Sequence, residues 1–211
     1  MDNFKTTIEA FNRLASAYQD KFMELDLYND TYDAFCSLVQ KQGARIFEIG
    51  CGPGNITRYI LSKRPDFKVE AIDIAPNMVQ LAKGNNPAAS FRVMDCREID
   101  TLADKFDAVI GGFCLPYLSK EDSVKLIKDT ASLLHHGGIF YFSTIEDAYN
   151  KSGFETSGNG QNKLFIYYHQ EDYLREMLRE NAFTVVDLIR KSYPKADGTS
   201  STHMIFLTRK E

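Results

Sequence analysis

Apolar residues near the N-terminus recur every three or four positions, which is the spacing of one face of an amphipathic helix. They are Ile8, Phe11, Ala15, Tyr18, Phe22 and Leu25. A second helix is predicted from about Asn29 to Gln40, and Gly43 ends it in the way a C-terminal glycine does. We expect the two helices to form a cap, residues 1–42, on one main domain, residues 43–211.

From Ala44 onward, short apolar runs alternate with helical segments. Strands that alternate with helices are typical of βαβ units, whose right-handed crossovers build a parallel sheet covered on both faces. The pair Gly137-Gly138 is predicted to turn the chain into a strand that starts at Ile139. The predicted strands are 44–49, 67–72, 90–94, 106–113 and 139–145, and the predicted helices are 55–62, 76–83 and one that Ser119 caps.

The C-terminal third follows another pattern. Residues 151–163 are rich in Gly, Ser and Asn and are predicted to form a mobile loop, before a strand or rim element at 164–168 and a helix at 170–181. The polar tract 192–202 is too short for a helical crossover, so the strands on either side of it should form an antiparallel hairpin. The predicted class is therefore α/β, doubly wound, with a mostly parallel seven-stranded sheet, a C-terminal antiparallel hairpin and N-terminal capping helices.

The composition mainly argues against certain classes of protein and site. The net charge is −4 and no basic run exceeds two residues, so no large nucleic-acid footprint is expected. No apolar run approaches the roughly 20 residues that span a bilayer, and no secretory signal is visible, so we expect a cytoplasmic protein. The four cysteines form no CxxC pair, and the adjacent His135 and His136 do not share a helix face, so no metal site is expected.

Three glycines at alternate positions follow the strand at 44–49. Gly50, Gly52 and Gly54 let the backbone approach a ligand closely, and the next helix points its N-terminus at that ligand. Such a ligand lies at the carboxyl ends of the strands. Asp73 ends the following strand, where its carboxylate can accept hydrogen bonds from both hydroxyls of a ribose. Together these features indicate a cofactor that contains a nucleoside.

The residues around this turn distinguish two cofactor classes. Dinucleotide-binding folds use GxGxxG, because a pyrophosphate lies on the helix N-terminus. Here Asn55 takes the sixth position, and Glu48 puts a negative charge close to the turn. That charge is unfavourable beside a pyrophosphate and suits a cation, such as the amino group of a methionine moiety.

Five segments of the chain stand in an order and spacing shared by one enzyme family. They are EIGCGPG (48–54), EAIDIAPNMVQLAK (70–83), VMDCREI (93–99), FDAVIGGFCLPYL (106–118) and LLHHGGIFYFST (133–144). In these segments, which cover about 44–144, the chain resembles class I S-adenosylmethionine-dependent methyltransferases of the small-molecule type. The resemblance implies S-adenosyl-L-methionine as cofactor and transfer of its sulfonium methyl to a nucleophile by in-line displacement.

The resemblance also implies which residues surround the cofactor. The glycine loop would pack against its amino-acid part, Asp73 would hold the ribose hydroxyls, and Asp95 would accept a hydrogen bond from the adenine amino group. The residues alone leave other readings open, since Asp73 and Asp95 are also suited to cap a helix or a turn and Tyr18 to pack in the core. The implied set is Tyr18, Glu48, Gly50, Cys51, Gly52, Gly54, Asp73, Ile74, Met78, Asp95, Cys96, Arg97, Gly112 and Phe113.

The acceptor is predicted to be a small molecule. The segment GGFCLPYL lacks the (Asn/Asp/Ser)-Pro-Pro-aromatic motif of methylases that act on exocyclic amines of bases. Tyr117, Tyr168 and His169 are the candidate catalytic residues near the acceptor, and for His169 a role as general base stands beside a local structural role. Residues 151–163 could form a lid, and His203 is interpreted as structural. Two alternatives remain open: a regulatory protein that binds the cofactor without transfer, and a nicotinamide oxidoreductase. The sequence does not determine the acceptor atom or the oligomeric state.

Overall fold

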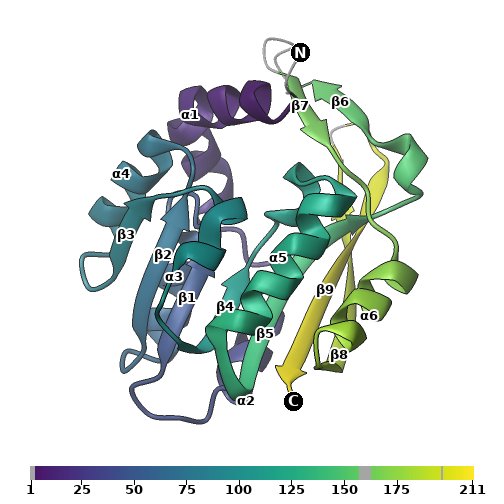
Figure 1. Cartoon of the computed structure of the whole chain (residues 1–211). Helices are drawn as coiled ribbons and strands as arrows, with labels where there is room; N and C mark the ends of the chain where they lie inside the picture. The colour runs from purple at the N-terminus through teal and green to yellow at the C-terminus, as the bar shows by residue number, and fades with distance from the viewer. Residues whose placement is uncertain (1–2, 157–162, 196) are drawn as a thin grey trace.

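A computed structural model describes residues 3–156, 163–195 and 197–211, and its centre is a seven-stranded sheet in the order β3-β2-β1-β4-β5-β9-β8 (Figure 1). The strands are β1 Arg45–Ile49, β2 Lys68–Asp73, β3 Ser90–Val93, β4 Phe106–Gly111, β5 Leu134–Glu146, β8 Phe183–Pro194 and β9 Ser200–Lys210. The helices are α1 Asn3–Phe22, α2 Asn29–Leu38, α3 Asn55–Lys63, α4 Pro76–Asn85, α5 Lys120–Leu133 and α6 Glu171–Glu180. Short 3-10 helices are η1 Cys96–Thr101, η2 Leu115–Tyr117 and η3 Tyr149–Lys151.

The direction of the strands confirms the predicted fold class. Strands β1 to β5 pair in parallel, whereas β9 runs antiparallel to both β5 and β8. The order reverses between β1 and β4, and such a switch point is where open α/β sheets bind ligands, at the carboxyl ends of their strands.

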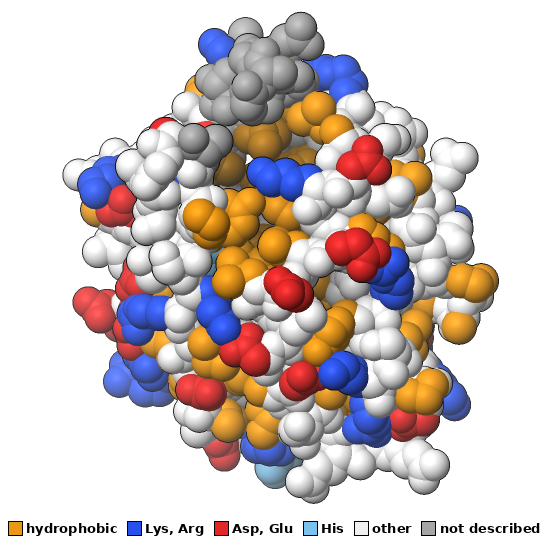
Figure 2. All heavy atoms as spheres, turned by 180° about the vertical axis from the view of Figure 1, so that it is seen from behind, with side chains coloured by type: hydrophobic (Ala, Val, Ile, Leu, Met, Phe, Trp, Pro, Cys, Tyr) orange, Lys and Arg blue, Asp and Glu red, His pale blue; other side chains and the backbone are white. Residues whose placement is uncertain are grey.

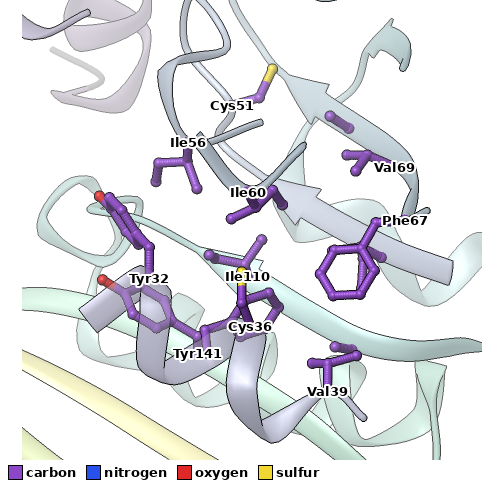
Figure 3. Close-up of a cluster of buried hydrophobic side chains, with 14 of the residues drawn as sticks. Tyr32, Cys36, Val39, Cys51, Ile56, Ile60, Phe67, Val69, Ile110 and Tyr141 are labelled. Atoms are coloured by element: carbon purple, nitrogen blue, oxygen red, sulfur yellow. The ribbon is translucent and has the colours of Figure 1, made fainter. Parts of the chain in front are cut away.

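Alternate residues of the central strands enter two separate cores. Ile46 and Ile110 join the core beneath α2, α3 and α4, and Phe47 and Val109 join the core beneath α5 and α6. Figure 3 shows side chains of α2 and α3 converging on Ile110 and Tyr141 in the first core. Because both faces of each strand are buried, these strands carry continuous apolar runs in the sequence.

The predicted cap separates into two helices with different surroundings. Helix α2 is part of the main core, where Phe35 is fully buried and Thr31 hydrogen-bonds Tyr141 of β5 over 3.0 Å. Helix α1 lies across the carboxyl end of the sheet, between α4 and β7 (Figure 1). Within the described residues, none of the helices combines the length and apolar character that crossing a bilayer requires.

Three local predictions need correction. Gly137 lies inside β5, where a bulge between Leu134 and Ile139 replaces the predicted turn. The hairpin strands run on into the polar tract 192–202, where Ser192, Tyr193 and Pro194 pair with Thr202, Ser201 and Ser200. Part of the predicted loop 151–163 is a strand, β6 Gly153–Thr156, which pairs antiparallel with β7 Lys163–Ile166. Residues 157–162 of that predicted loop lie outside the described residues, and Lys151 ends η3.

Candidate functional site

The loop between β1 and α3 is held in place by the end of the neighbouring strand. All three of its glycines have positive φ, at 68° for Gly50, 52° for Gly52 and 84° for Gly54, a region that favours glycine. The backbone N–H of Gly52 donates to Asp73 Oδ2 over 2.9 Å. The other carboxylate oxygen of Asp73 accepts from the N–H of Ala75 over 2.8 Å, at the start of α4. Asp73 thus joins the glycine loop to α4.

Beside this loop lies a cavity, which we call the loop cavity, with about 720 Å³ of empty space including the solvent at its mouth. Helix α1 closes it with four residues that the sequence analysis did not assign: Phe4, Thr7, Ile8 and Phe11. The predicted cofactor residues that line it are Tyr18, Gly50, Gly52, Asp73, Ile74, Met78, Asp95, Cys96, Gly112 and Phe113.

Four predicted cofactor residues do not line the loop cavity: Glu48, Cys51, Gly54 and Arg97. Gly54 instead begins α3 and sits so close to α4 that an added Cβ would lie 2.3 Å from Asn86 Nδ2. Arg97 pairs with Asp95 at 2.7 Å and places its guanidinium 3.6 Å from the ring centroid of Phe4. This arrangement fixes the first turn of α1 over the cavity, and Asp95 also caps η1, as the alternative reading of that residue allowed.

Glu48 lies beneath the glycine loop with only 1% of its surface exposed. The Thr57 hydroxyl of α3 donates to its Oε2, while its Oε1 has no hydrogen-bond partner among the described residues. Burial raises the pKa of this carboxyl to about 8, and the negative charge of Asp73 adds to the increase. A buried acid with an unpartnered oxygen is costly unless a cation or donor approaches it.

A second cavity adjoins the first, and we call it the aromatic cavity because its lining includes Tyr18, Phe22, Tyr28, Tyr32, Phe113, Tyr117 and Tyr193. Cys51 lines only this second space, together with Tyr28, Tyr193 and His203. Figure 2, which views the molecule from behind Figure 1, shows a hollow with hydrophobic side chains on its floor. The residues common to both cavities are Tyr18, Gly50, Gly52, Gly112, Phe113 and Tyr117.

The residues common to both cavities form a wall between them, which we call the shared wall, and one of them has a strained backbone. Phe113 has φ of 56°, an uncommon conformation for a residue with a side chain, and its N–H donates to Ser143 Oγ of β5 over 2.9 Å. Next to it, a Cβ at Gly112 would lie 2.2 Å from Ile56 Cδ1. Backbone strain of this kind is concentrated at binding sites.

Comparison with known families supplies the deciding observation. Residues 46–138 match the family model described as a methyltransferase domain. Residues 46–138 therefore belong to a methyltransferase domain. This confirms the resemblance predicted from the five sequence segments, and with it S-adenosyl-L-methionine as the cofactor of the family.

Individual proteins similar to this methyltransferase domain differ in what they act on. A malonyl-[acyl-carrier protein] O-methyltransferase of Ilyobacter polytropus is 30% identical over 72% of this chain and 55% of its own length. A tRNA N(3)-methylcytidine methyltransferase of Schizosaccharomyces pombe is 25% identical over 75% of this chain and 72% of its own. The chain thus spans about half of the first relative.

A solved structure supports the fold. The Burkholderia thailandensis 1,6-didemethyltoxoflavin-N1-methyltransferase, with its substrate and S-adenosylhomocysteine bound, is 21% identical, with a TM-score of 0.73 over 98% of this chain and 88% of its own.

The three acceptor-site candidates of the methyltransferase domain lie in different surroundings. Tyr117 lines both cavities, and burial raises its pKa. Tyr168 lines neither cavity and donates its hydroxyl to Glu155 over 2.6 Å. His169 is fully buried, donates Nε2–H to the Leu115 carbonyl over 2.9 Å and accepts from the Tyr173 hydroxyl at Nδ1. With both ring nitrogens bonded and no surface on either cavity, His169 joins α6 to η2.

Sequence reasoning missed Tyr28 and His203 as residues of the aromatic cavity, interpreting His203 as structural. They are 175 residues apart and meet only because β9 inserts beside β5. A histidine near the start of a strand gives no periodic signal, so only the sheet order could reveal the pair.

Proposed function

We propose that this chain is an S-adenosylmethionine-dependent methyltransferase that acts on a small molecule. The observation that carries the proposal is the shared wall: the loop cavity and the aromatic cavity meet at the glycine loop, Gly112, Phe113 and Tyr117. A methyl donor in the first space and an acceptor in the second would meet there. The second cavity favours transfer over the regulatory alternative, which needs no room for an acceptor.

Each lining residue has a proposed part in holding the cofactor. The Asp73 carboxylate would accept from the ribose hydroxyls, Ile74 and Met78 would pack on the adenine, and Asp95 would face its amino group. The tight turns at Gly50 and Gly52 would leave room for the amino-acid part. When bound, the cofactor supplies an activated methyl group, so the protein has to position the acceptor and exclude water.

The positions of Glu48 and Tyr18 suggest two further parts. Glu48 lies under the loop with one oxygen that has no partner in the described part of the chain, and a positively charged amino group near the loop would favour its ionised form. Tyr18 lines both cavities, so it would lie between the two reactants. Aromatic rings at such a boundary also stabilise a neighbouring cation through cation–π contact.

The acceptor is proposed to be a small molecule rather than a nucleic acid. The aromatic cavity is a recess bounded by β7 and the start of β9. The net charge of −4 does not suit a polyanion. The similarity to a tRNA methyltransferase makes nucleic acid the alternative that an acceptor screen has to include.

The cofactor assignment is tested by calorimetric titration with S-adenosylhomocysteine. We expect the parent protein to bind it and Asp73→Asn to bind about 10- to 100-fold more weakly, because charge-assisted hydrogen bonds contribute about 1.5–3 kcal/mol. Asp187→Asn, at an exposed position of β8, is the matched control and should bind like the parent. Equal affinity in the parent and Asp73→Asn would contradict the assignment.

The activity is tested separately with labelled S-adenosylmethionine. The label should pass to compounds of a small-molecule panel and not to transfer RNA. A protein that binds the cofactor but labels no acceptor would favour the regulatory alternative, and labelled RNA would overturn the acceptor class.

A further inference from the structure

His203 is held at the wall of the aromatic cavity by the sheet itself. It lies near the start of β9, where it pairs with Ile145 of β5 on one side and Lys191 of β8 on the other. Because β9 is antiparallel to β5, its first residues lie beside the carboxyl end of β5, where the cavity opens. His203 is 6% exposed and lines the cavity together with Ile145.

Both nitrogens of His203 have partners that also line the cavity. Nδ1 lies 2.7 Å from the Tyr28 hydroxyl oxygen, and Nε2 lies 3.0 Å from Ser201 Oγ. A neutral imidazole has one donor and one acceptor nitrogen, so Tyr28 can donate to Nδ1 while Nε2–H donates to Ser201. Burial, together with the positive charge of Lys195, lowers the pKa of His203 to about 4 and keeps the ring neutral.

Flat rings stand around this hydrogen-bonded pair. The Tyr193 ring is stacked on His203 with centroids 5.0 Å apart and planes 10° apart, and the Tyr28 ring is nearly parallel to His203 at 12°. The Phe113 ring contacts both, with its centroid 4.8 Å from that of His203 in an edge-on arrangement and 5.0 Å from that of Tyr28 in a tilted one. Through Phe113 the pair borders the wall shared with the loop cavity. Such walls favour a planar ligand that stacks on them.

Building on the proposed function, we propose that the acceptor is a planar aromatic compound whose methyl-accepting atom carries an ionisable proton, and that Tyr28 and His203 remove this proton. The acceptor oxygen or nitrogen forms a bond to the methyl carbon as the carbon–sulfur bond breaks, and that electron pair stays on sulfur. The acceptor proton passes to the Tyr28 oxygen while the Tyr28 proton passes to His203 Nδ1. After product release the imidazolium returns its proton to water.

The charge balance of this step fits a buried histidine. Transfer removes one positive charge from the donor sulfur, and the relay places one positive charge on His203. The cavity therefore contains the same net charge before and after the reaction. A carboxylate acceptor is already ionised at neutral pH and would leave the pair without a role.

The test uses a series of phenols of graded acidity and a parallel series of benzoates, with labelled S-adenosylmethionine. The variants are Tyr28→Phe and His203→Gln, and the controls are Tyr59→Phe and the exposed His136→Gln. For the least acidic phenol we expect the variants to lose about 100- to 10,000-fold in rate, the range of general base catalysis. The loss should shrink as the phenols become more acidic, because an ionised acceptor needs no base.

Two binding measurements separate this role from a structural one. Calorimetry with S-adenosylhomocysteine, and then with 4-nitrophenol added to that complex, should give affinities within about 3-fold of the parent for Tyr28→Phe. An equal loss of rate across the whole phenol series, no loss, or methylation of benzoates alone would overturn the inference while leaving the proposed function intact. Failure of the parent to bind S-adenosylhomocysteine would instead overturn the proposed function, and this inference with it.

Discussion

At the scale of single residues, the most unusual group is the buried carboxyl of Glu48. A carboxyl with pKa raised to about 8 keeps its proton in the folded protein at pH values where the unfolded chain has released it. Between about pH 4.5 and pH 8 the folded state therefore binds more protons than the unfolded state. The contribution of Glu48 to stability is complete below this window and is lost as the pH rises through it.

Replacing Glu48 should change this pH dependence. We expect the free energy of unfolding of the parent to fall by about 2 kcal/mol more than that of Glu48→Gln between pH 6 and pH 8, since one pKa unit corresponds to about 1.4 kcal/mol. Urea unfolding at several pH values measures the difference. The exposed Glu176→Gln should keep the parent's pH dependence. If the free energy of unfolding changes with pH in the same way in the parent and in Glu48→Gln, Glu48 is ionised in the folded protein.

At the scale of elements, the site depends on how closely the helices approach one another. Helix α1 is tied to α4 by the two hydrogen bonds between Asn12 and Asn77, at 2.9 and 2.8 Å. Helix α3 meets α4 at Gly54, whose carbonyl accepts from Asn86 Nδ2 over 3.0 Å. The third glycine of the motif thus serves the packing of two helices, while the first two border the cavity.

This distinction predicts different effects of alanine at two glycines with similar backbone conformation. Gly54→Ala should lower the free energy of unfolding by about 2–4 kcal/mol, because the backbone strain adds to a clash with Asn86 and Ala82. Gly198→Ala has nearly the same φ, 81° against 84°, but its added Cβ would meet no atom of the described residues within 4 Å, so it should cost only about 1–2 kcal/mol. Urea unfolding measures both losses. If the two variants lose equal free energy of unfolding, the close approach of α3 to α4 at Gly54 contributes nothing to stability.

At the scale of the whole molecule, the buried histidines and the buried acid give the free energy of unfolding opposite dependences on pH. His169 and His203 both have pKa values lowered to about 4, mainly by burial. Since the unfolded chain binds their protons near pH 6.5, their contribution is complete above that value and is lost as the pH falls toward 4. The contribution of Glu48 is lost as the pH rises toward 8. We therefore expect the free energy of unfolding to be greatest near neutral pH.

The acid side of this maximum can be tested at His169, which touches neither cavity. From pH 6.5 to pH 5 the parent should lose about 2 kcal/mol more stability than His169→Gln, whatever the stability of the variant at neutral pH. Thermal unfolding at fixed ionic strength measures both slopes. His136→Gln, exposed at the surface, should follow the parent, and a variant slope as steep as the parent's would show that His169 is protonated in the folded protein.

The sequence by itself determined the succession of elements, the fold class and the glycine loop with Asp73. These depend on local rules: the period of apolar residues, the conformational freedom of glycine and the burial of parallel strands on both faces. Contacts between distant segments follow no such period.

Only the tertiary structure decided that α1 covers the loop cavity, that Glu48 loses its solvent, that His169 is tied to Leu115 and Tyr173, and that His203 meets Tyr28. Each of these depends on which strands become neighbours, because the order of strands in a sheet places residues together that the chain keeps far apart.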